Sequence, residues 1–214
     1  MTERGVFIVI EGIDGAGTTT QCQRYAAHIR KKGRSAHVTR EPSDGPVGVL
    51  IRMMLRKEIA PRSRTNAEMM ALLFAADRLD HVLSEVDTEL EKGSIVISDR
   101  YALSSLAYQS AAAADGSDGK VSWIRALNQF ARKPDVTLVV DVPADVARER
   151  RLSRGGGEEL YEAAALQARL ADIYLHAEAL LPGERVVHVD GAGSVAEVEA
   201  RIIEALNPFV DASW

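Results

Sequence analysis

Near its N-terminus the chain reads VFIVIEGIDGAGTTT, from Val6 to Thr20. The residues from Val6 to Ile10 are β-branched or aromatic without a polar interruption, which favours a strand buried on both faces. Strands of this kind belong to parallel sheets. A glycine-rich turn follows, and the residues from Gln21 onward favour a helix. The stretch therefore predicts a strand, a loop and a helix in that order.

Four more short apolar runs are separated by segments with helical character, and they span residues 35–39, 94–98, 136–142 and 185–189. Apolar residues recur near helical spacing in residues 67–92 and 194–206, which predicts two amphipathic helices. Residues 114–120 and 153–159 are rich in glycine, and we expect irregular structure there. Strands that alternate with helices predict a doubly wound α/β fold, with a five-stranded parallel sheet and helices on both faces.

The composition fits a globular protein, with 46% hydrophobic and 27% charged residues in a chain of 214. A chain of this length can bury one core, and it carries no internal repeat or linker, so we expect a single domain over residues 1–214. The net charge of -5 provides no global positive field for a nucleic-acid polymer. The first apolar run is too short for a signal sequence or a membrane span, which predicts a cytoplasmic protein without a membrane partner.

The glycine-rich turn matches the phosphate-binding pattern G-x-x-x-x-G-K-[ST] at all but one position. Backbone N–H groups of such a turn point at phosphate oxygens, and the helix N-terminus adds positive potential. Thr19 holds the place of the hydroxyl that ligates Mg²⁺. The residues expected to bind ATP phosphates are Gly12, Ile13, Asp14, Gly15, Ala16, Gly17, Thr18, Thr19 and Thr20.

Thr18 stands where the pattern has a lysine that reaches the β- and γ-phosphates. Losing one preorganised donor typically costs on the order of 3 kcal/mol in the barrier, or about a hundred- to a thousandfold in rate. Another cation would have to replace this charge for fast catalysis.

Several motifs occur in the same order as in the thymidylate kinases, which are P-loop nucleoside monophosphate kinases, and the chain resembles that family along nearly its whole length. They are IEGIDG at residues 10–15, TREP at 39–42, LLFAADR at 72–78, DRY at 99–101 with AYQ at 107–109, and DVPADV at 141–146. The resemblance implies a P-loop kinase fold with an Arg- and Gly-rich lid at about residues 148–162. It implies phosphorylation of dTMP to dTDP by ATP with Mg²⁺, for dTTP biosynthesis, and a homodimer formed through helices that flank the sheet.

The resemblance also implies a set of contacts with dTMP. Arg40 would lie at the acceptor phosphate, where its planar fork suits phosphate geometry. Phe74 would pack on the thymine ring, and Arg78 would donate to its O4 edge. Residues four apart share one helix face, so both side chains can reach the same base. Gln109 would bind the base and Tyr108 would crowd the 2′ position. The implied dTMP-binding residues are Asp14, Arg40, Phe74, Arg78, Arg100, Ser104, Tyr108, Gln109 and Tyr161, with Asp14 at the 3′-hydroxyl.

Four residues carry the catalytic roles that the resemblance implies. Asp99, at the end of a strand, could bind Mg²⁺ through water opposite Thr19, while Arg100 faces the phosphates being joined. Relatives carry a lid-type arginine either in the P-loop or in the lid, and Gly15 and Ala16 leave none in this P-loop. Arg150 and Arg154 match the lid arginines best. A lid rich in cations would partly offset the missing lysine.

Two other functions stay open at this point. The chain could phosphorylate another nucleoside monophosphate, or it could be a nucleotide-binding protein with weak or altered activity because of Thr18. Phe74, Arg78 and Gln109 favour dTMP over other acceptors. Structural roles also remain open: a solvated arginine for Arg40, a core Phe with a surface Arg for residues 74 and 78, and an ion pair between Asp99 and Arg100.

Overall fold

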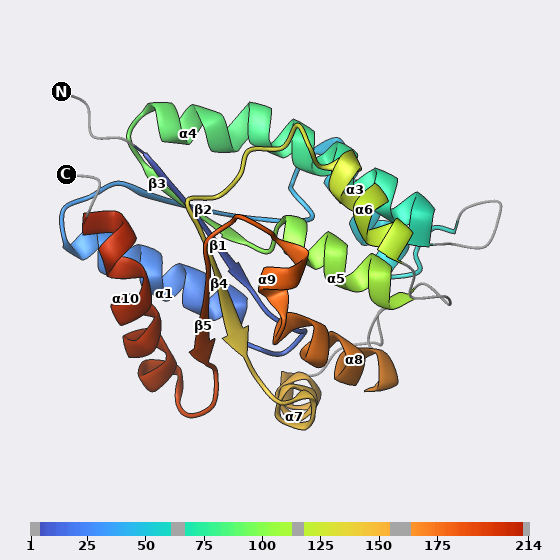
Figure 1. Cartoon of the computed structure of the whole chain (residues 1–214). Helices are drawn as coiled ribbons and strands as arrows, with labels where there is room; N and C mark the ends of the chain where they lie inside the picture. Colours follow the sequence, from blue (N-terminus) through green and yellow to red (C-terminus); the bar gives the residue numbers. More distant parts are fainter. Residues whose placement is uncertain (1–4, 61–66, 113–117, 155–163, 212–214) are drawn as a thin grey trace.

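The structure, a computed structural model, describes residues 5–60, 67–112, 118–154 and 164–211. In these ranges five parallel strands form a sheet in the order β2-β3-β1-β4-β5 (Figure 1). The strands are β1 (Val6–Glu11), β2 (Ala36–Arg40), β3 (Ile95–Asp99), β4 (Val136–Asp141) and β5 (Val186–Asp190). All five predicted strands are confirmed, each end within one residue, and the α/β fold is confirmed with them.

Helices cover both faces of this sheet (Figure 1). Helices α1 and α10 pack together on one face, while α4, α5 and α8 lie on the other. The helical segments are α1 (Thr18–Lys31), α2 (Pro46–Leu55), α3 (Ala67–His81), η1 (Val82–Val86), α4 (Asp87–Glu91), α5 (Ala102–Ala112), α6 (Asp118–Leu127), α7 (Ala144–Arg154), α8 (Ala164–Tyr174), α9 (Ala177–Leu180) and α10 (Val195–Asp211). None of the described helices has the length and apolar character needed to cross a membrane.

The central strands are buried because helices cover both of their faces. Every residue of β1 and β3 is buried, whereas the edge strands β2 and β5 are only partly so. Side chains such as Ile8, Ile10 and Ile97 are fully buried. Each contributes roughly 1.5–3 kcal/mol relative to an exposed position. The uninterrupted apolar run of β1 therefore reflects its place at the centre of the sheet.

Residues 67–91 are helical, as predicted, but the helix widens to a π-helical turn, η1, between α3 and α4. The hydroxyl of Ser84 donates to the Asp80 carbonyl at 2.7 Å, which competes with the regular backbone hydrogen bonds at this point. The last helix begins as predicted, because Ser194 and Glu197 cap it reciprocally. It continues to Asp211, past the predicted end at residue 206.

The two predicted irregular segments are only partly described. Helix α6 already begins at Asp118, so the prediction was wrong for residues 118–120, and residues 114–117 lie outside the described part. The prediction was also wrong for Ser153 and Arg154, which still belong to α7, and residues 155–159 lie outside the described part. The expected lid at 148–162 is thus seen only as the second half of α7.

Parallel pairing brings the carboxyl ends of the strands to one edge of the sheet. Ile10 and Arg40 both lie opposite Asp99 in the register. The loop after β1 therefore leaves the sheet beside the residues that end β2 and β3. In open α/β sheets this edge is where ligands bind.

Candidate active site

The predicted P-loop is a tight turn between β1 and α1. Gly15 and Gly17 have φ angles of 95° and 94°, a left-handed conformation that favours glycine. A Cβ atom on Gly15 would lie 2.3 Å from the carbonyl oxygen of Ala147 in α7. Glycine at this position therefore allows α7 to pack directly on the loop. The helix after the loop begins at Thr18, so its free N–H groups face the turn.

Two adjacent threonines at the start of α1 differ in their surroundings. Thr18 is buried, with 6% of its surface exposed. Thr19 Oγ1 donates to Asp99 Oδ2 at 2.5 Å, so the two predicted metal ligands lie side by side. Asp99 Oδ1 is buried and has no hydrogen-bond partner among the described residues. One hydroxyl and one carboxylate with a free oxygen fit Mg²⁺, which commonly takes one or two carboxylates plus substrate phosphates.

Arg100 follows β3 in a left-handed conformation, with φ at 71°, and its N–H donates to the Ile10 carbonyl at 3.0 Å. Its guanidinium forms an ion pair with Asp14 of the P-loop, Nη2 to Oδ1, at 2.5 Å. It also donates to Ser104 Oγ at 3.1 Å and lies over the ring of Tyr108. Asp99 and Arg100 thus bond to different partners, Thr19 and Asp14, and an ion pair between the two is not found.

A cavity of about 160 Å³ opens beside this ion pair. Its walls come from the P-loop, the loop after β2, and helices α3 and α5. They are formed by Asp14, Glu41, Pro42, Leu55, Phe74, Arg78, Arg100, Tyr101, Ser104, Ser105, Tyr108 and Gln109. Seven of the nine residues predicted for dTMP line this one cavity. Arg40 is not among them, and Tyr161 lies outside the described residues.

Arg40 does not line this cavity, and its side chain is largely exposed. Its Nη2 lies 2.8 Å from Asp44 Oδ1, and 58% of its side chain is exposed. The hydrogen bond from Arg40 is the main cause that lowers the pKa of Asp44. Such exposed ion pairs contribute about 0–1 kcal/mol, so Arg40 can exchange Asp44 for another anion at little cost.

Arg78 is buried, with 1% of its residue surface exposed, so the alternative of a surface arginine is wrong. Its Nη2 donates to Glu41 Oε2 at 2.6 Å and to Ser105 Oγ at 3.1 Å, and its Nη1 donates to Asn128 Oδ1 at 2.5 Å. The buried Nε has no hydrogen-bond partner in the described part of the chain. Tertiary packing around α3, which periodicity alone does not reveal, encloses this charge.

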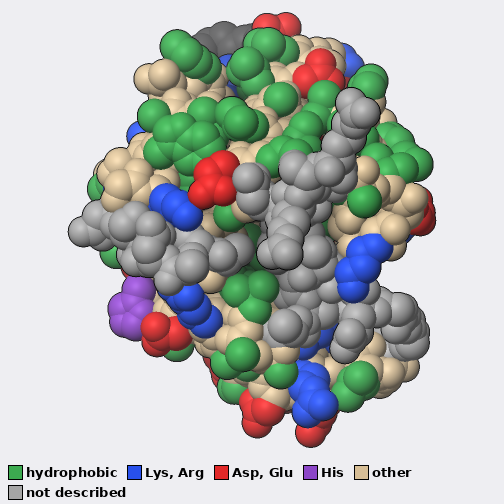
Figure 2. Space-filling view, turned by 90° about the vertical axis from the view of Figure 1, so that its right-hand side faces the viewer, with side chains coloured by type: hydrophobic (Ala, Val, Ile, Leu, Met, Phe, Trp, Pro, Cys, Tyr) green, Lys and Arg blue, Asp and Glu red, His purple; other side chains and the backbone are tan. Residues whose placement is uncertain are grey.

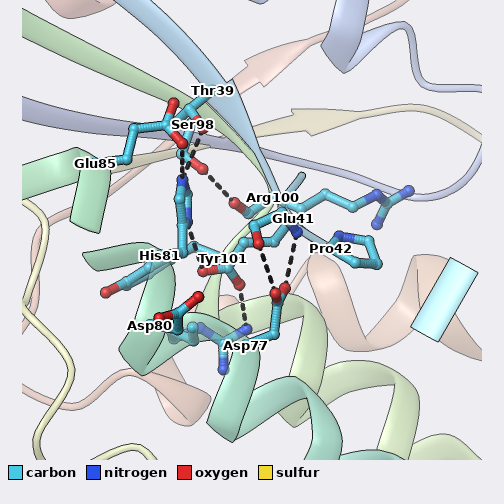
Figure 3. A network of polar contacts seen from close by, with 12 residues as sticks. Thr39, Glu41, Pro42, Asp77, Asp80, His81, Glu85, Ser98, Arg100 and Tyr101 are labelled. Atoms are coloured by element: carbon cyan, nitrogen blue, oxygen red, sulfur yellow. Dashed lines mark hydrogen bonds and ion pairs between the residues drawn. The ribbon is translucent and has the colours of Figure 1, made fainter. Parts of the chain in front are cut away.

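Two buried glutamates support the cavity, and the sequence analysis missed both. Glu11 accepts hydrogen bonds from the N–H groups of Tyr101 and Ser104 at 2.8 and 3.1 Å, at the start of α5. Burial raises the pKa of Glu11, against the opposing charge of Arg100 and these hydrogen bonds. Glu41 contacts Arg78, and it also contacts His81 (Figure 3). A carboxylate at the end of an apolar strand was the available signal for Glu11.

The loop after β2 is fixed by a further buried carboxylate. Asp77 accepts from the Ser43 N–H at 2.8 Å and from Ser43 Oγ at 2.6 Å. Asp77 and His81 lie on the same face of α3, four residues apart. These contacts hold the TREP segment against α3 and thereby place Glu41 in the cavity wall.

Arginines of α7 also contact the P-loop. Arg150 donates to the Gly191 carbonyl at 3.0 Å and to the Ala16 carbonyl at 3.4 Å. Arg151, which the sequence analysis did not select, donates to the Asp14 carbonyl. Arg154 ends α7, and its side chain lies outside the described part. Arg148 and Arg151 are three residues apart on α7. From this spacing alone, the sequence could not show which arginines of the helix contact the P-loop.

A second cavity, of about 360 Å³, lies between the P-loop, α7 and the start of α10. It is lined by Ala16, Gly17, Thr20, Gln21, Arg150, Ser153, Gly193, Val195 and Val198. On the face seen in Figure 2, Lys and Arg side chains lie mainly in the middle and lower parts. The P-loop therefore separates a cavity near Phe74 from one near Arg150.

Comparison with known proteins shows which family the sequence of this chain matches. The family model described as thymidylate kinase matches residues 10–202. The probable thymidylate kinase of Thermococcus gammatolerans is 38% identical over 203 residues, which cover 93% of this chain and 94% of the relative. The thymidylate kinase of Dinoroseobacter shibae is 38% identical over 208 residues, covering 96% and 98%. That of Cereibacter sphaeroides is 36% identical over 219 residues, covering 98% of each chain.

Proposed function

The chain belongs to the thymidylate kinase family, and we propose that it transfers the γ-phosphoryl group of ATP to dTMP, forming dTDP and ADP. The observation that carries the proposal is the position of Arg100 and Asp14. They join the P-loop to a cavity lined by an aromatic ring, a buried guanidinium and an amide. Phosphoryl transfer depends on positioning and on charge stabilisation, and both are available at this point.

The thymine base would lie in the first cavity. Phe74 offers a ring for stacking, and the unpartnered Nε of Arg78 is a donor that suits the O4 acceptor of thymine. Cytosine carries an amino donor at that position, which would leave the buried guanidinium facing another donor. Gln109 would complete the hydrogen bonds to the base, and Tyr108 would limit the space at the 2′ position.

The acceptor phosphate would lie between Arg100 and Arg40. Arg100 already occupies the edge of the cavity, and Arg40 would leave its exposed partner Asp44 to bind the phosphate. Asp14 would accept the 3′-hydroxyl with the lone pairs that Arg100 leaves free, and Ser104 would support Arg100. The fixed guanidinium of Arg100 would stabilise charge that develops between the two phosphates.

ATP would bind with its base in the second cavity and its phosphates on the P-loop. Arg150 lines that cavity and contacts the loop, so it bridges the two parts of the donor site. Mg²⁺ would be held by Thr19 and Asp99, and it would neutralise charge on the donor phosphates. Arg150, Arg151 and, from the sequence, Arg154 would supply the positive charge that Thr18 does not.

A homodimer is part of this proposal. Leu72, Leu79 and Leu83 recur at helical spacing along α3 and η1, and 52%, 38% and 65% of their surfaces are exposed. Helix α2 packs beside α3 and adds Val49, Leu50 and Met53, which are also exposed. Pairing these stripes between two copies would bury them. Hydrophobic side chains also gather in the upper part of the face in Figure 2, at the height of α3.

The cytoplasmic location and the single domain stay predictions.

ADP release in the presence of dTMP, dUMP, dCMP or dGMP tests the function. We expect dTMP to give the highest kcat/KM, well above that of dCMP. Equal values for dTMP and dCMP would refute the base assignment and favour a kinase of broader acceptor range. Binding of dTMP and ATP without ADP release would instead favour a nucleotide-binding protein whose catalysis is lost.

A further inference from the structure

Glu41 connects the base-binding cavity to a buried histidine. One oxygen, Oε2, accepts from Arg78 Nη2 at 2.6 Å. The other, Oε1, lies 3.3 Å from His81 Nδ1, a contact that Figure 3 shows. The side chains of Glu41, Arg78 and His81 are 2%, 1% and 0% exposed. Water therefore cannot replace a lost partner, and each group depends on the others for its orientation.

The second ring nitrogen of His81 is held as firmly as the first. Nε2 lies 2.7 Å from Thr39 Oγ1 and 3.6 Å from Glu85 Oε2. The ring is thus fixed between β2 and η1, while its Nδ1 faces the loop that carries Glu41. The Nδ1 of a ring held in this way can determine where the Glu41 carboxylate lies.

Arg78 depends on this carboxylate for its charge balance. Ser105 and Asn128, its other hydrogen-bond partners, are neutral, and Glu41 is its ion-pair partner within the described residues. These contacts leave the buried Nε without a partner among the described residues, as a free donor. A rotation of the Glu41 carboxylate would turn the guanidinium and move Nε away from its present direction.

We propose that His81 is a positioning residue for acceptor recognition: through Glu41 it holds Arg78 in the orientation that binds the acceptor base. The inference rests on the proposed function, because the base in question is the thymine of dTMP. His81 does not line the cavity itself, so its effect passes through Glu41. The effect should fall on acceptor binding and leave ATP binding unchanged.

The surroundings of His81 favour its protonated form. Burial opposes the charge, but the hydrogen bond and charge of Glu41, with the charges of Glu85 and Asp77, raise the pKa of His81 above its ordinary value. The carboxylates that act on its charge are Glu41, Asp44, Asp77 and Glu85. Arg78 shares Glu41 with it, and His37 shares Glu85. Protonated His81 donates from both nitrogens, to Glu41 and to Thr39. Loss of the proton removes the charge that strengthens the bond to Glu41.

Two neutral replacements separate the two ring contacts. In His81→Asn the amide nitrogen lies near the place of Nδ1 and can still donate to Glu41. In His81→Gln it lies near the place of Nε2 and reaches Thr39 instead. We expect His81→Gln to raise the KM and Kd for dTMP on the order of tenfold, the size of one lost charge-assisted hydrogen bond. His81→Asn should stay within about threefold of the wild type, and Thr39→Val, the matched control for the other contact, should do the same.

The pH profile gives a readout that a merely structural role would not move. The Kd of the wild type for dTMP, divided by that of His81→Asn at each pH, should rise as the pH passes above the pKa of His81. Calorimetry with dTMP measures this ratio even if the wild type transfers no phosphate, so failure of the proposed function is recognised separately.

Two results would overturn the role of His81. One is a flat ratio across the pH range. The other is an equal change in the Kd for dTMP and the KM for ATP in both His81 variants. Melting temperatures identify a variant that does not fold. If His81→Gln does not fold, the pH dependence of the Kd ratio between the wild type and His81→Asn still tests the role of His81.

Discussion

Replacing Arg150 by methionine asks whether α7 supplies the charge that Thr18 lacks. The Arg150 guanidinium is held at the P-loop by two neutral acceptors, the carbonyls of Gly191 at 3.0 Å and Ala16 at 3.4 Å. Within the described residues it forms no ion pair with a carboxylate, so no carboxylate of that part of the chain neutralises its charge. A phosphate bound on the loop would therefore meet a full positive charge.

The expected magnitude follows from the loss of one fixed donor. Removing such a donor costs on the order of 3 kcal/mol in the barrier, which corresponds to about a hundredfold in kcat. Arg150→Met should lower kcat by about that factor. Thr18→Lys should raise kcat by less than roughly tenfold, because a cation is already present, and it should help more in the Arg150→Met background.

Steady-state ADP release at saturating ATP and dTMP measures both changes. Arg148→Met is the matched control, since Arg148 lies exposed on the same helix, and it should leave kcat unchanged. Arg154→Met should lower kcat if the prediction from sequence is right. A hundredfold gain from Thr18→Lys, together with indifference to the loss of Arg150 and Arg154, would refute the compensation argument.

Three further changes test other parts of the site. Arg100→Ala should lower kcat by at least about a hundredfold, because it would stabilise charge formed during transfer; a change in KM alone would place Arg100 at the rim. Arg78→Ala should raise the KM for dTMP and leave the KM for ATP unchanged. It should also lower the free energy of unfolding by roughly 3 kcal/mol, because Glu41 loses its buried partner. An unchanged KM for dTMP in a folded variant would argue against the base contact. Folding raises the pKa of His81, so its contribution to the free energy of unfolding should be fully present below about pH 6.5 and lost as the pH rises through the folded pKa. Denaturant unfolding measures this contribution as the difference between the wild type and His81→Asn. A difference that does not change across this pH range would contradict the prediction.

The fold could be predicted because its signals are local. The apolar run of β1 and the glycines after it specify a buried strand and a tight turn within a few residues. The cap of Ser194 on Glu197 likewise fixes the start of α10. The turn at η1 could not be foreseen, because Ser84 can bond to a carbonyl or to water, and the pattern of apolar residues is the same in both cases.

The supporting shell of the site could not be predicted, because its contacts join distant parts of the chain. Glu11 bonds to Tyr174, which lies 163 positions away, and Arg78 to Asn128, which lies 50 positions away. Spacing along α3 placed Phe74 and Arg78 on one face but could not tell that the guanidinium is buried. The partner that decides this, Glu41, comes from another element.

Transfer of γ-labelled phosphate from ATP to dTMP tests the central claim most directly. Labelled ATP is incubated with the protein, Mg²⁺ and dTMP, and the products are separated and counted. We predict that the label appears in dTDP, with one dTDP formed for each ADP, and that Arg100→Ala removes most of this transfer. Label that appears only in inorganic phosphate, or that stays in ATP while both nucleotides bind, would contradict the assignment.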